Sequence, residues 1–377
     1  MIIICEPQCI GFEHAEFNAT LINIVQYAYP NKNILFLSES KHLEYVKNIL
    51  ENDKKIEFIE IKIPPRQFNL KRFPPEFKIV KNVFNLSNNI KADKIIFSSI
   101  TIPTLVSIKI LIRHFKVIKT VVIPHNLLEE INSKIPLIPV ETIFWPKFWI
   151  SFFNTPNLIY LILGQSIKEL LIQKIPHLEK YLLTIDHPCS FKNRKIQKNK
   201  KNDILKFGFL GVGKKSKGID IFLKLAHEVQ KENKKSKFIV IGHIIERSYK
   251  KNSVYIPSPK LPLKQEKYNE YIQEIDYAIF LYKEDSYRLT ASGALFDAFS
   301  HLKPIIALKN PFFEYYFDKM GDIGYLCNNY EEIKELTINI INHQPTERYI
   351  NQQKNILKGR NQFKLDKLAK KIRDEWI

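Results

Sequence analysis

Apolar runs and amphipathic stretches alternate along the first half of the chain. Short apolar runs predict strands, and stretches whose apolar residues recur every three or four positions predict helices. The predicted strands cover residues 1–5, 33–37, 55–61, 94–97, 120–123 and 158–163, and the predicted helices cover 15–27, 41–51, 105–115 and 166–173. This alternation is typical of a parallel sheet with helices on both faces.

The same alternation restarts after residue 203. Here the predicted strands are 204–210, 237–241, 253–256, 277–281 and 304–308, with helices at 219–232, 268–274 and 293–300. Residues 189–203 are polar and basic with little to bury, which favours a linker. At the other end, Leu365, Leu368, Ile372 and Trp376 form one stripe of an amphipathic helix. We therefore predict an N-terminal domain at 1–188, a linker at 189–203, a second domain at 204–360 and a terminal helix at 361–377.

The length of the chain bears on the number of domains, and its net charge bears on the kind of partner it binds. A chain of 377 residues is long enough for two domains, each with its own core. A net charge of +19 favours anionic partners such as nucleotides, phosphorylated lipids, acidic membranes or nucleic acid. A coding bias toward Lys, Asn and Ile would produce the same charge without a specific role. Nucleic acid is the weakest of these partners, because the lysines are spread out and no aromatic residues interleave with them.

The cysteines and the N-terminal residues bear on the cellular compartment. The four cysteines are scattered without zinc-site spacing, so we expect reduced thiols and a cytoplasmic location. Residues 1–7 lack the charged start and long apolar run of a signal peptide. No stretch of about 20 apolar residues occurs, so we expect no transmembrane helix.

A glycine-containing turn follows the first strand of the second half. Gly211 and Gly213 would permit positive φ and close approach of a ligand, and Gly218 precedes a helix. Lys217 would reach a phosphate as a point charge. The spacing matches neither a Walker A loop nor a Gly-x-Gly-x-x-Gly fingerprint, so an ordinary strand-to-helix turn is an equal alternative.

A second turn of small residues precedes the helix predicted at 293–300. Ser292 or Thr290 would cap this helix, and the N–H groups around Gly293 would face an anion. Asp297, further along the helix, would accept hydrogen bonds from ribose hydroxyls. The alternative is a capped core helix with Asp297 as a solvated surface carboxylate.

Together these two segments resemble the retaining GT-B glycosyltransferases known as glycosyl transferases group 1, of the family-four type. Residues 211–218 keep that family's spacing from its first glycine to its Lys-Gly pair. Residues 275–281 resemble its Ala-Asp strand, and residues 297–306 resemble its helix that runs into a Pro-containing strand. The resemblance covers residues 204–330. In the first half of the chain it extends only to the alternation of predicted strands and helices.

The resemblance implies an α/β fold of the GT-B type, with two Rossmann-like domains facing a cleft and the C-terminal helix crossing back to the first domain. It also implies a nucleoside-diphosphate sugar as donor and no metal. Lys217 and the N–H groups of Ser292 and Gly293 would hold the diphosphate, and Asp297 the ribose. His125, at the end of a first-domain strand, would lie beside the sugar as the catalytic residue and donate a hydrogen bond to it.

The chain departs from the family at several positions. Val212 replaces an arginine that helps to bind the diphosphate, and Leu289 replaces the first glutamate of a pair, for which Glu284 or Asp285 would substitute from a shifted loop. Residues 11–16 replace the family's glycine-rich loop and keep only Gly11. His14 and Glu16 in this segment would contact the acceptor, although an ordinary helix start is the alternative.

The expected activity is sugar transfer to a lipid-linked or polysaccharide acceptor, as in lipopolysaccharide or capsule synthesis. Residues 143–153 are dense in aromatic side chains, which would form an interfacial patch at the inner face of the cytoplasmic membrane. A buried connector is the alternative for this segment. Two other functions stay open: a non-catalytic GT-B scaffold, favoured by Val212 and Leu289, and a sugar-nucleotide epimerase.

Overall fold

The computed structural model describes residues 1–50, 55–115, 118–133, 135, 139–191, 196, 203–245, 253–283 and 286–375. The chain divides into two compact units. Unit 1 consists of residues 1–190, 289–291 and 363–377, and unit 2 of residues 191–288 and 292–362. Most of the predicted linker, together with Glu284, Asp285 and Trp376, lies outside the described residues.

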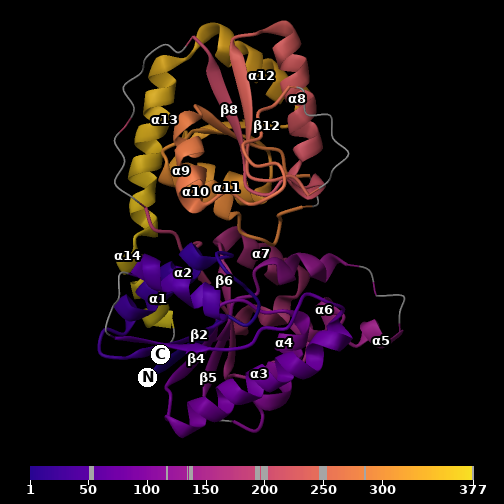
Figure 1. The fold of residues 1–377 in the computed structure, drawn as a ribbon, viewed down its shortest axis with the longest axis vertical. Helices are drawn as coiled ribbons and strands as arrows, with labels where there is room; N and C mark the ends of the chain where they lie inside the picture. Colours follow the sequence, from indigo (N-terminus) through magenta and orange to yellow (C-terminus); the bar gives the residue numbers. More distant parts are fainter. Residues whose placement is uncertain are drawn as a thin grey trace. The chain divides into compact units, whose positions relative to one another are not determined.

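Unit 1 contains a seven-stranded sheet in the order β3-β2-β1-β4-β5-β6-β7 (Figure 1). All its pairings are parallel, and at the centre Ile3 pairs with both Leu35 and Ile95. Every residue of β1 is buried, as expected for a strand covered by helices on both faces. The strands are β1 (Ile2–Cys5), β2 (Ile34–Ser38), β3 (Ile56–Glu60), β4 (Lys94–Phe97), β5 (Lys119–Val122), β6 (Leu158–Leu163) and β7 (Leu182–Ile185).

Helices cover both faces of this sheet (Figure 1). On one face, α1 (Ala15–Ala28), α2 (Ser40–Leu50) and the C-terminal α14 (Leu365–Glu375) pack into one core with the strands. Leu368 and Ile372 of α14 belong to this core, so these two residues of the predicted C-terminal stripe do pack against the N-terminal sheet. The other elements of unit 1 are α3 (Asn69–Asn89), α4 (Ile102–Leu111), η1 (Asn126–Asn132), α5 (Pro139–Thr142), α6 (Pro146–Ser151), α7 (Gln165–Lys174) and η2 (Pro176–Tyr181).

The helix α3 has no counterpart among the predicted elements. Pro74 and Pro75 lie inside it, and adjacent prolines in a sequence usually indicate a break. Neither proline can donate a hydrogen bond to the carbonyl groups of Leu70 and Lys71. The helix persists because the apolar side of its later turns, from Ile79 onward, is buried.

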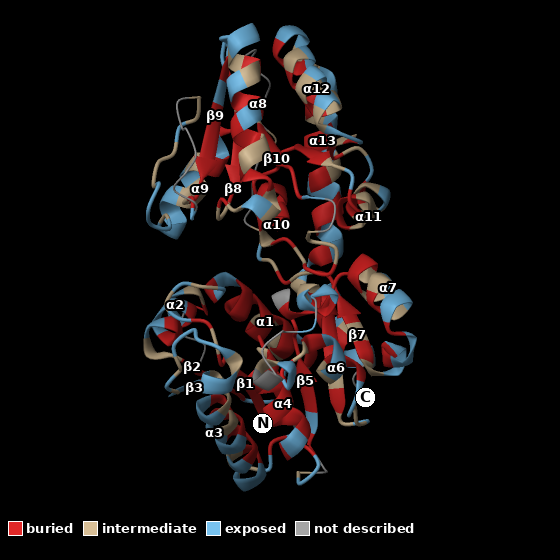
Figure 2. Ribbon diagram, turned by 90° about the vertical axis from the view of Figure 1, so that its right-hand side faces the viewer, coloured by how far each residue is buried: buried red, intermediate tan, exposed pale blue. Residues whose placement is uncertain are grey.

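Unit 2 contains a five-stranded sheet in the order β12-β11-β10-β8-β9, again with parallel pairings. On β8, Phe209 packs against Phe222 of α8, whereas Phe280 of β10 packs against Phe313 of α11 on the other face. Figure 2 shows the strands as buried and the helices as buried on one side only. The elements are β8 (Leu205–Leu210), η3 (Lys215–Lys217), α8 (Ile219–Glu232), β9 (Ser236–Ile241), α9 (Gln265–Glu274), β10 (Tyr277–Phe280), α10 (Gly293–Ser300), β11 (Ile305–Leu308), α11 (Pro311–Met320), β12 (Gly324–Cys327), α12 (Tyr330–His343), α13 (Thr346–Gly359) and η4 (Arg360–Phe363).

One sequence prediction in unit 2 needs correction, and some helices of this unit were not predicted. The strand predicted at 253–256 is a single bridge between Ile239 and Tyr255. The helices α11 and α12 were not predicted, although each begins at an asparagine whose side chain accepts a hydrogen bond from the first turn. These caps are Asn310, bonded to the N–H of Phe312, and Asn329, bonded to the N–H of Glu332.

The order of the strands indicates where ligands would bind in each unit. In unit 1 the chain runs outward from β1 to β3 and then restarts on the other side at β4, so the order reverses between β1 and β4. In unit 2 the reversal lies between β8 and β10. In open parallel sheets, ligands bind beyond the carboxyl ends of the strands at such reversals. We therefore expect ligands to bind beside the loops after β1, β4, β8 and β10.

Among the described residues, no helix is both long enough and apolar enough to cross a membrane. All four cysteines are described, and each is a free thiol.

Candidate functional site

In unit 2, the loop after β8 is shaped by glycine. Gly211 and Gly218 have φ of 85° and 73°, and a Cβ on Gly218 would lie 2.0 Å from the carbonyl oxygen of Leu281. Gly213 does not have the positive φ that we expected. Its N–H instead donates to the carbonyl group of His243, at 2.8 Å, and the packing of Ile244 and Ile219 leaves little room for a Cβ.

Lys217 lies at the centre of this loop. A Cβ built on Gly211 would be 3.3 Å from the Lys217 Nζ, so the ammonium group lies directly over the glycine. The same Nζ is 5.5 Å from the centre of the Tyr287 ring, and the Nζ of Lys214 is 5.6 Å from it. Burial, and then the charge of Lys214, lower the pKa of Lys217 to about 8, although Asp297 acts in the opposite direction. A bound anion would relieve both of the unfavourable effects.

The loop after β10 contributes an aromatic pair. Tyr287 stacks on Tyr282, with ring centres 4.2 Å apart, and the Tyr282 hydroxyl is 2.5 Å from the Ser292 Oγ. Ser292 does stand at the N-cap of α10, but its side chain does not cap the helix as we expected, because its hydroxyl pairs with Tyr282. Gly293 is the first residue of α10, whereas Thr290 groups with unit 1.

Asp297 is half-buried on α10 and is not a fully solvated carboxylate. Its Oδ2 accepts a hydrogen bond of 2.9 Å from the Tyr268 hydroxyl of α9. Burial and the Asp297 charge raise the pKa of Tyr268, so this tyrosine stays a hydrogen-bond donor. Because Asp297 also acts on the pKa of Lys217, the two predicted ligand-binding residues lie within electrostatic reach of each other.

This part of unit 2 combines three features that suit a nucleoside diphosphate. The ammonium of Lys217 and the N-terminus of α8 suit the phosphates. Tyr287 offers a flat surface next to them. The carboxylate of Asp297 would accept hydrogen bonds from neutral hydroxyl groups.

In unit 1, the loop after β1 contains a buried carboxylate that sequence reasoning missed. Glu6 has no exposed surface. One of its oxygens accepts hydrogen bonds from the Ser99 hydroxyl and from the N–H groups of Gln8 and Cys9, at 3.0 and 3.1 Å. The other accepts hydrogen bonds from Asn18 and from Ser98 of the loop after β4, at 3.2 and 3.1 Å.

Glu6 is ionised in spite of its burial. Burial alone would raise its pKa, but the hydrogen bond from Ser99 and the interactions with His14, Gln8 and His42 together lower it. The carboxylate therefore joins the ends of β1 and β4 at the point where the strand order reverses. No local motif marks it, since Ser98 and Ser99 are more than 90 positions away in the chain.

The loop around Gly11 is held by this network and by α2. The Gly11 N–H donates to Glu39 at 3.1 Å, and the Gly11 carbonyl oxygen is 2.7 Å from the His42 Nδ1. Since a carbonyl group only accepts, Nδ1 carries the proton, and Nε2 accepts from Asn18 at 2.9 Å. Gly11 therefore has a positional role, with φ of 56° and open space beside its Cα.

His125 follows β5 and faces the same loops. Its Nε2 donates to the Ser98 carbonyl group at 2.8 Å, and its ring centre is 4.8 Å from that of His14 and 4.5 Å from that of Phe17. Burial, and then His14 and His187, lower the pKa of His125. A neutral imidazole that donates through Nε2 presents Nδ1 as an acceptor. The direction of the expected hydrogen bond therefore reverses: His125 would accept a hydrogen bond from a sugar hydroxyl.

His14 and Glu16 start α1 and are both exposed. His14 has a left-handed φ of 54° and lies with Glu6 and Cys9 in a group whose ligand atoms are within 4.8 Å of one another. Such a group is a possible metal site by distance. However, the oxygens of Glu6 already accept five hydrogen bonds, and burial keeps Cys9 a thiol by raising its pKa. Glu6 and Cys9 therefore fit a buried hydrogen-bonding network better than a metal centre.

The aromatic segment at residues 143–153 is partly buried, as a connector would be, and partly exposed, as an interfacial patch would be. Phe144 and Ile150 are buried, whereas the side chains of Ile143, Phe148, Phe152 and Phe153 are exposed. Lys109 of α4 holds the segment by donating to the carbonyl group of Phe152 at 2.5 Å, to that of Trp149 and to the Asn154 side chain. Burial lowers the pKa of Lys109 to about 7.

No protein-family model matches the chain, and no curated protein matches it in sequence. Solved structures do match it along its whole length. HepE from Anabaena, solved with UDP and glucose, gives a TM-score of 0.69 at 13% identity, covering 100% of this chain and 99% of its own.

Two further matches are similar in extent. WaaG, a glycosyltransferase involved in lipopolysaccharide biosynthesis, gives a TM-score of 0.67 at 12% identity over 99% of each chain. Sucrose-phosphate synthase from Thermosynechococcus elongatus gives 0.67 at 10% identity over 100% of this chain and 98% of its own. These proteins are GT-B glycosyltransferases, and the chain has the GT-B fold with two Rossmann-like domains.

Proposed function

We propose that this chain is a glycosyltransferase that moves a sugar from a nucleoside-diphosphate sugar to a glycan or lipid-linked acceptor. The observation that carries the proposal is the position of Lys217, Tyr287 and Asp297 around the carboxyl ends of β8 and β10. The fold supports it, because HepE, which shares this fold, was solved with UDP-glucose as well as with UDP.

The donor would bind to unit 2. Lys217 and the N–H groups at Ser292 and Gly293 would hold the diphosphate, and Asp297 would hold the ribose. As the bond between sugar and phosphate breaks, negative charge grows on the departing diphosphate. The Lys217 ammonium, poorly solvated in the free protein, would stabilise that charge more than it stabilises the ground state. We propose that this cation takes the place of a metal ion.

Unit 1 would provide contacts for the sugar and the acceptor. His125 would accept a hydrogen bond from a sugar hydroxyl through Nδ1, and Glu6 would hold the loops after β1 and β4 in place without touching the substrate. His14, with Gly11 and Glu16 in the same segment, would contact the acceptor. Retention of configuration is proposed from the resemblance to the retaining family alone.

The acceptor would be attached to a lipid at the cytoplasmic face of a membrane, as in lipopolysaccharide or capsule assembly. The net charge of +19 and the exposed side chains of Ile143, Phe148, Phe152 and Phe153 support this part of the proposal. Liposomes with anionic lipids should retain the chain at moderate salt, and their failure to do so would overturn it.

A non-catalytic binding protein is the second candidate. Leu289, in the place of a family glutamate, favours it, because an alkyl side chain can neither transfer a proton nor accept a hydrogen bond. The two candidates differ in turnover. A glycosyltransferase releases nucleoside diphosphate when donor and acceptor are both present, whereas a binding protein retains the intact donor.

A thermal-shift panel of UDP, GDP, CDP, ADP and TDP, with and without their common sugars, tests the proposal first. One diphosphate should raise the melting temperature of the wild type and not that of Lys217→Ala. Lys215→Ala is the matched control, because it removes the same charge from an exposed position of the same loop. If no nucleotide stabilises the wild type at millimolar concentration, the proposal fails.

A further inference from the structure

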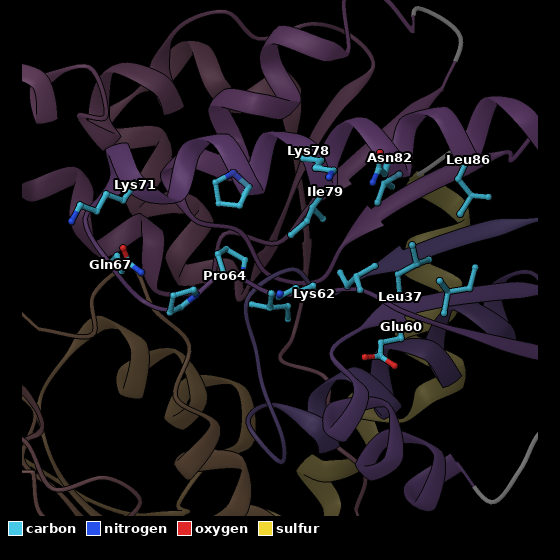
Figure 3. Close-up of a pocket in the computed structure, with 16 residues that line it drawn as sticks. Leu37, Glu60, Lys62, Pro64, Gln67, Lys71, Lys78, Ile79, Asn82 and Leu86 are labelled. Atoms are coloured by element: carbon cyan, nitrogen blue, oxygen red, sulfur yellow. The ribbon is translucent and has the colours of Figure 1, made fainter.

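Unit 1 contains an apolar groove between α3 and the end of β3, lined by none of the candidate site residues (Figure 3). Its volume is about 850 Å³, within the range of roughly 300–1,000 Å³ that is common for small-molecule sites. Ile79, Val83 and Leu86 of α3 form one wall. Leu37 of β2 and residues 59–65 form the other.

Both walls of the groove are stiff. Pro64 and Pro65 line one side and Pro75 lines the other, and each proline ring fixes its own φ. On the α3 side, Ile79 and Val83 are also part of the buried core, which anchors the helix. The apolar surface is therefore formed before any ligand arrives, so little ordering would oppose binding.

The charged side chains along the groove are mostly positive. Lys62, Lys71 and Lys78 line it and are exposed, and Glu60 is the single carboxylate among the lining residues. Figure 3 shows Lys71 at one end of the groove, Leu86 at the opposite end, and Lys62 and Lys78 between them. A ligand that complements this arrangement has an apolar body and an anionic group near the lysines.

Two exposed apolar side chains lie outside the groove at the start of α3. Phe68 is 72% exposed and Leu70 is 49% exposed. The Asn69 side chain donates to Glu141 at 3.1 Å, which links this end of α3 to α5, next to the aromatic segment at 143–153. Exposed apolar side chains gathered in this way indicate a surface that contacts a membrane or another apolar partner.

We propose that the groove binds the acyl or isoprenoid chain of a phosphate-bearing membrane lipid, with Lys62, Lys71 and Lys78 contacting the phosphate. The apolar walls suit the chain, the lysines suit the phosphate, and the exposed side chains at Phe68 and Leu70 suit the membrane from which the lipid is drawn. The inference rests on the proposed function, because it identifies the lipid carrier of the acceptor as the occupant.

Titration of the full chain with alkyl phosphates of increasing length, below their micelle concentration, tests the inference. Affinity should rise about fourfold with each methylene until the groove is filled. Inorganic phosphate and the matching alkyl alcohols should bind far more weakly, because each lacks one of the two interactions. An affinity that does not depend on chain length would overturn the proposal.

Paired variants on α3 locate the binding site. Asn82 lines the groove and Asn85 does not, and both are exposed, so Asn82→Trp should weaken binding at least tenfold while Asn85→Trp leaves it unchanged. Lys78→Glu should weaken binding of the phosphate, and Lys81→Glu, outside the groove, should not. Far-UV circular dichroism and melting temperature establish that all four variants are folded.

The outcomes separate this inference from the proposed function. If a nucleotide stabilises the chain but no alkyl phosphate binds, the groove proposal fails and the glycosyltransferase proposal stands. If alkyl phosphates bind in the predicted pattern but no nucleotide does, the groove stands and the glycosyltransferase proposal fails. Self-association that Asn82→Trp abolishes, without lipid binding, would assign the groove to a second copy of the chain and overturn the proposal.

Discussion

The carboxyl edges of the two sheets contain charges of opposite sign. The negative charge is stabilised by hydrogen bonds from its own chain, and the positive charge is not stabilised in this way by the described residues. At the edge of the unit 1 sheet, the buried carboxylate of Glu6 accepts five hydrogen bonds from its own chain, and its pKa is lowered. At the edge of the unit 2 sheet, burial and Lys214 lower the pKa of Lys217, so the positive charge is disfavoured there. The same topology thus holds one charge that its own chain compensates and one that, in our proposal, a ligand would compensate.

Replacing Glu6 should have the largest effect. Glu6→Ala leaves two backbone N–H groups and three side-chain donors without their acceptor, and should lower the free energy of unfolding by about 3–5 kcal/mol. Urea unfolding followed by tryptophan fluorescence measures this. The exposed Glu44→Ala in α2 is the control and should leave the midpoint unchanged. A loss no larger than that of the control would show that the network has no structural role.

Replacing Lys217, in contrast to replacing Glu6, should weaken ligand binding without lowering the stability of the free protein. Lys217→Met removes a disfavoured charge, so the ligand-free melting temperature at pH 7 should stay the same or rise. Affinity for the nucleoside diphosphate should fall about ten- to a hundredfold, the value of one hydrogen bond to a charged group. A large loss of stability without ligand would mean that Lys217 supports the fold, which would remove the contrast with Glu6.

The histidines of unit 1 give a prediction about pH. Burial, and then His14, lower the pKa of His187 to about 4, whereas an unfolded histidine has a pKa of about 6.5. The unfolded chain therefore binds the proton first, and stability is lost as pH falls from about 6.5 toward 4. His187→Gln should reduce this slope in urea titrations at a series of pH values. The exposed His227→Gln should not, and an equal change in both variants would contradict the assignment.

Asp297 should give the smallest effect. If it holds the ribose, Asp297→Ala should weaken nucleoside diphosphate binding about tenfold and leave inorganic pyrophosphate binding unchanged. This is the low end of the range for a hydrogen bond to a charged group, because the carboxylate already accepts a hydrogen bond from Tyr268. The exposed carboxylate of Asp318 in α11 offers a matched control through Asp318→Ala. Equal weakening of both ligands would mean that Asp297 acts through Lys217 and not on the ribose.

The difference between the edges also explains what the sequence could predict. The loop after β8 is local: Gly211, Lys217 and Gly218 lie within eight positions, so the sequence could suggest a phosphate site there, with an ordinary strand-to-helix turn as an equal alternative. The phosphate site stays a prediction. The Glu6 network joins residues from the loop after β1, from α1 and from the loop after β4, and only the pairing of β1 with β4 brings them together. No pattern along the chain could have indicated it.

The sequence also predicted part of the fold and missed part of it. Most of the central strands were predicted within one or two residues, because strands buried on both faces are continuous apolar runs. The helix α3 was missed because Pro74 and Pro75 outweighed the apolar periodicity that follows them. The groove beside α3 was missed for the same reason.

The central claim is that Lys217 is the charge that binds the diphosphate, and calorimetry at pH 8 tests it most directly. With a pKa of about 8, Lys217 is partly deprotonated in the free protein, and a bound diphosphate should raise that pKa. Titration in two buffers of different ionisation enthalpy should therefore reveal proton uptake by the wild type and none by Lys217→Met. Tight binding without proton uptake, or the same uptake in both proteins, would contradict the account.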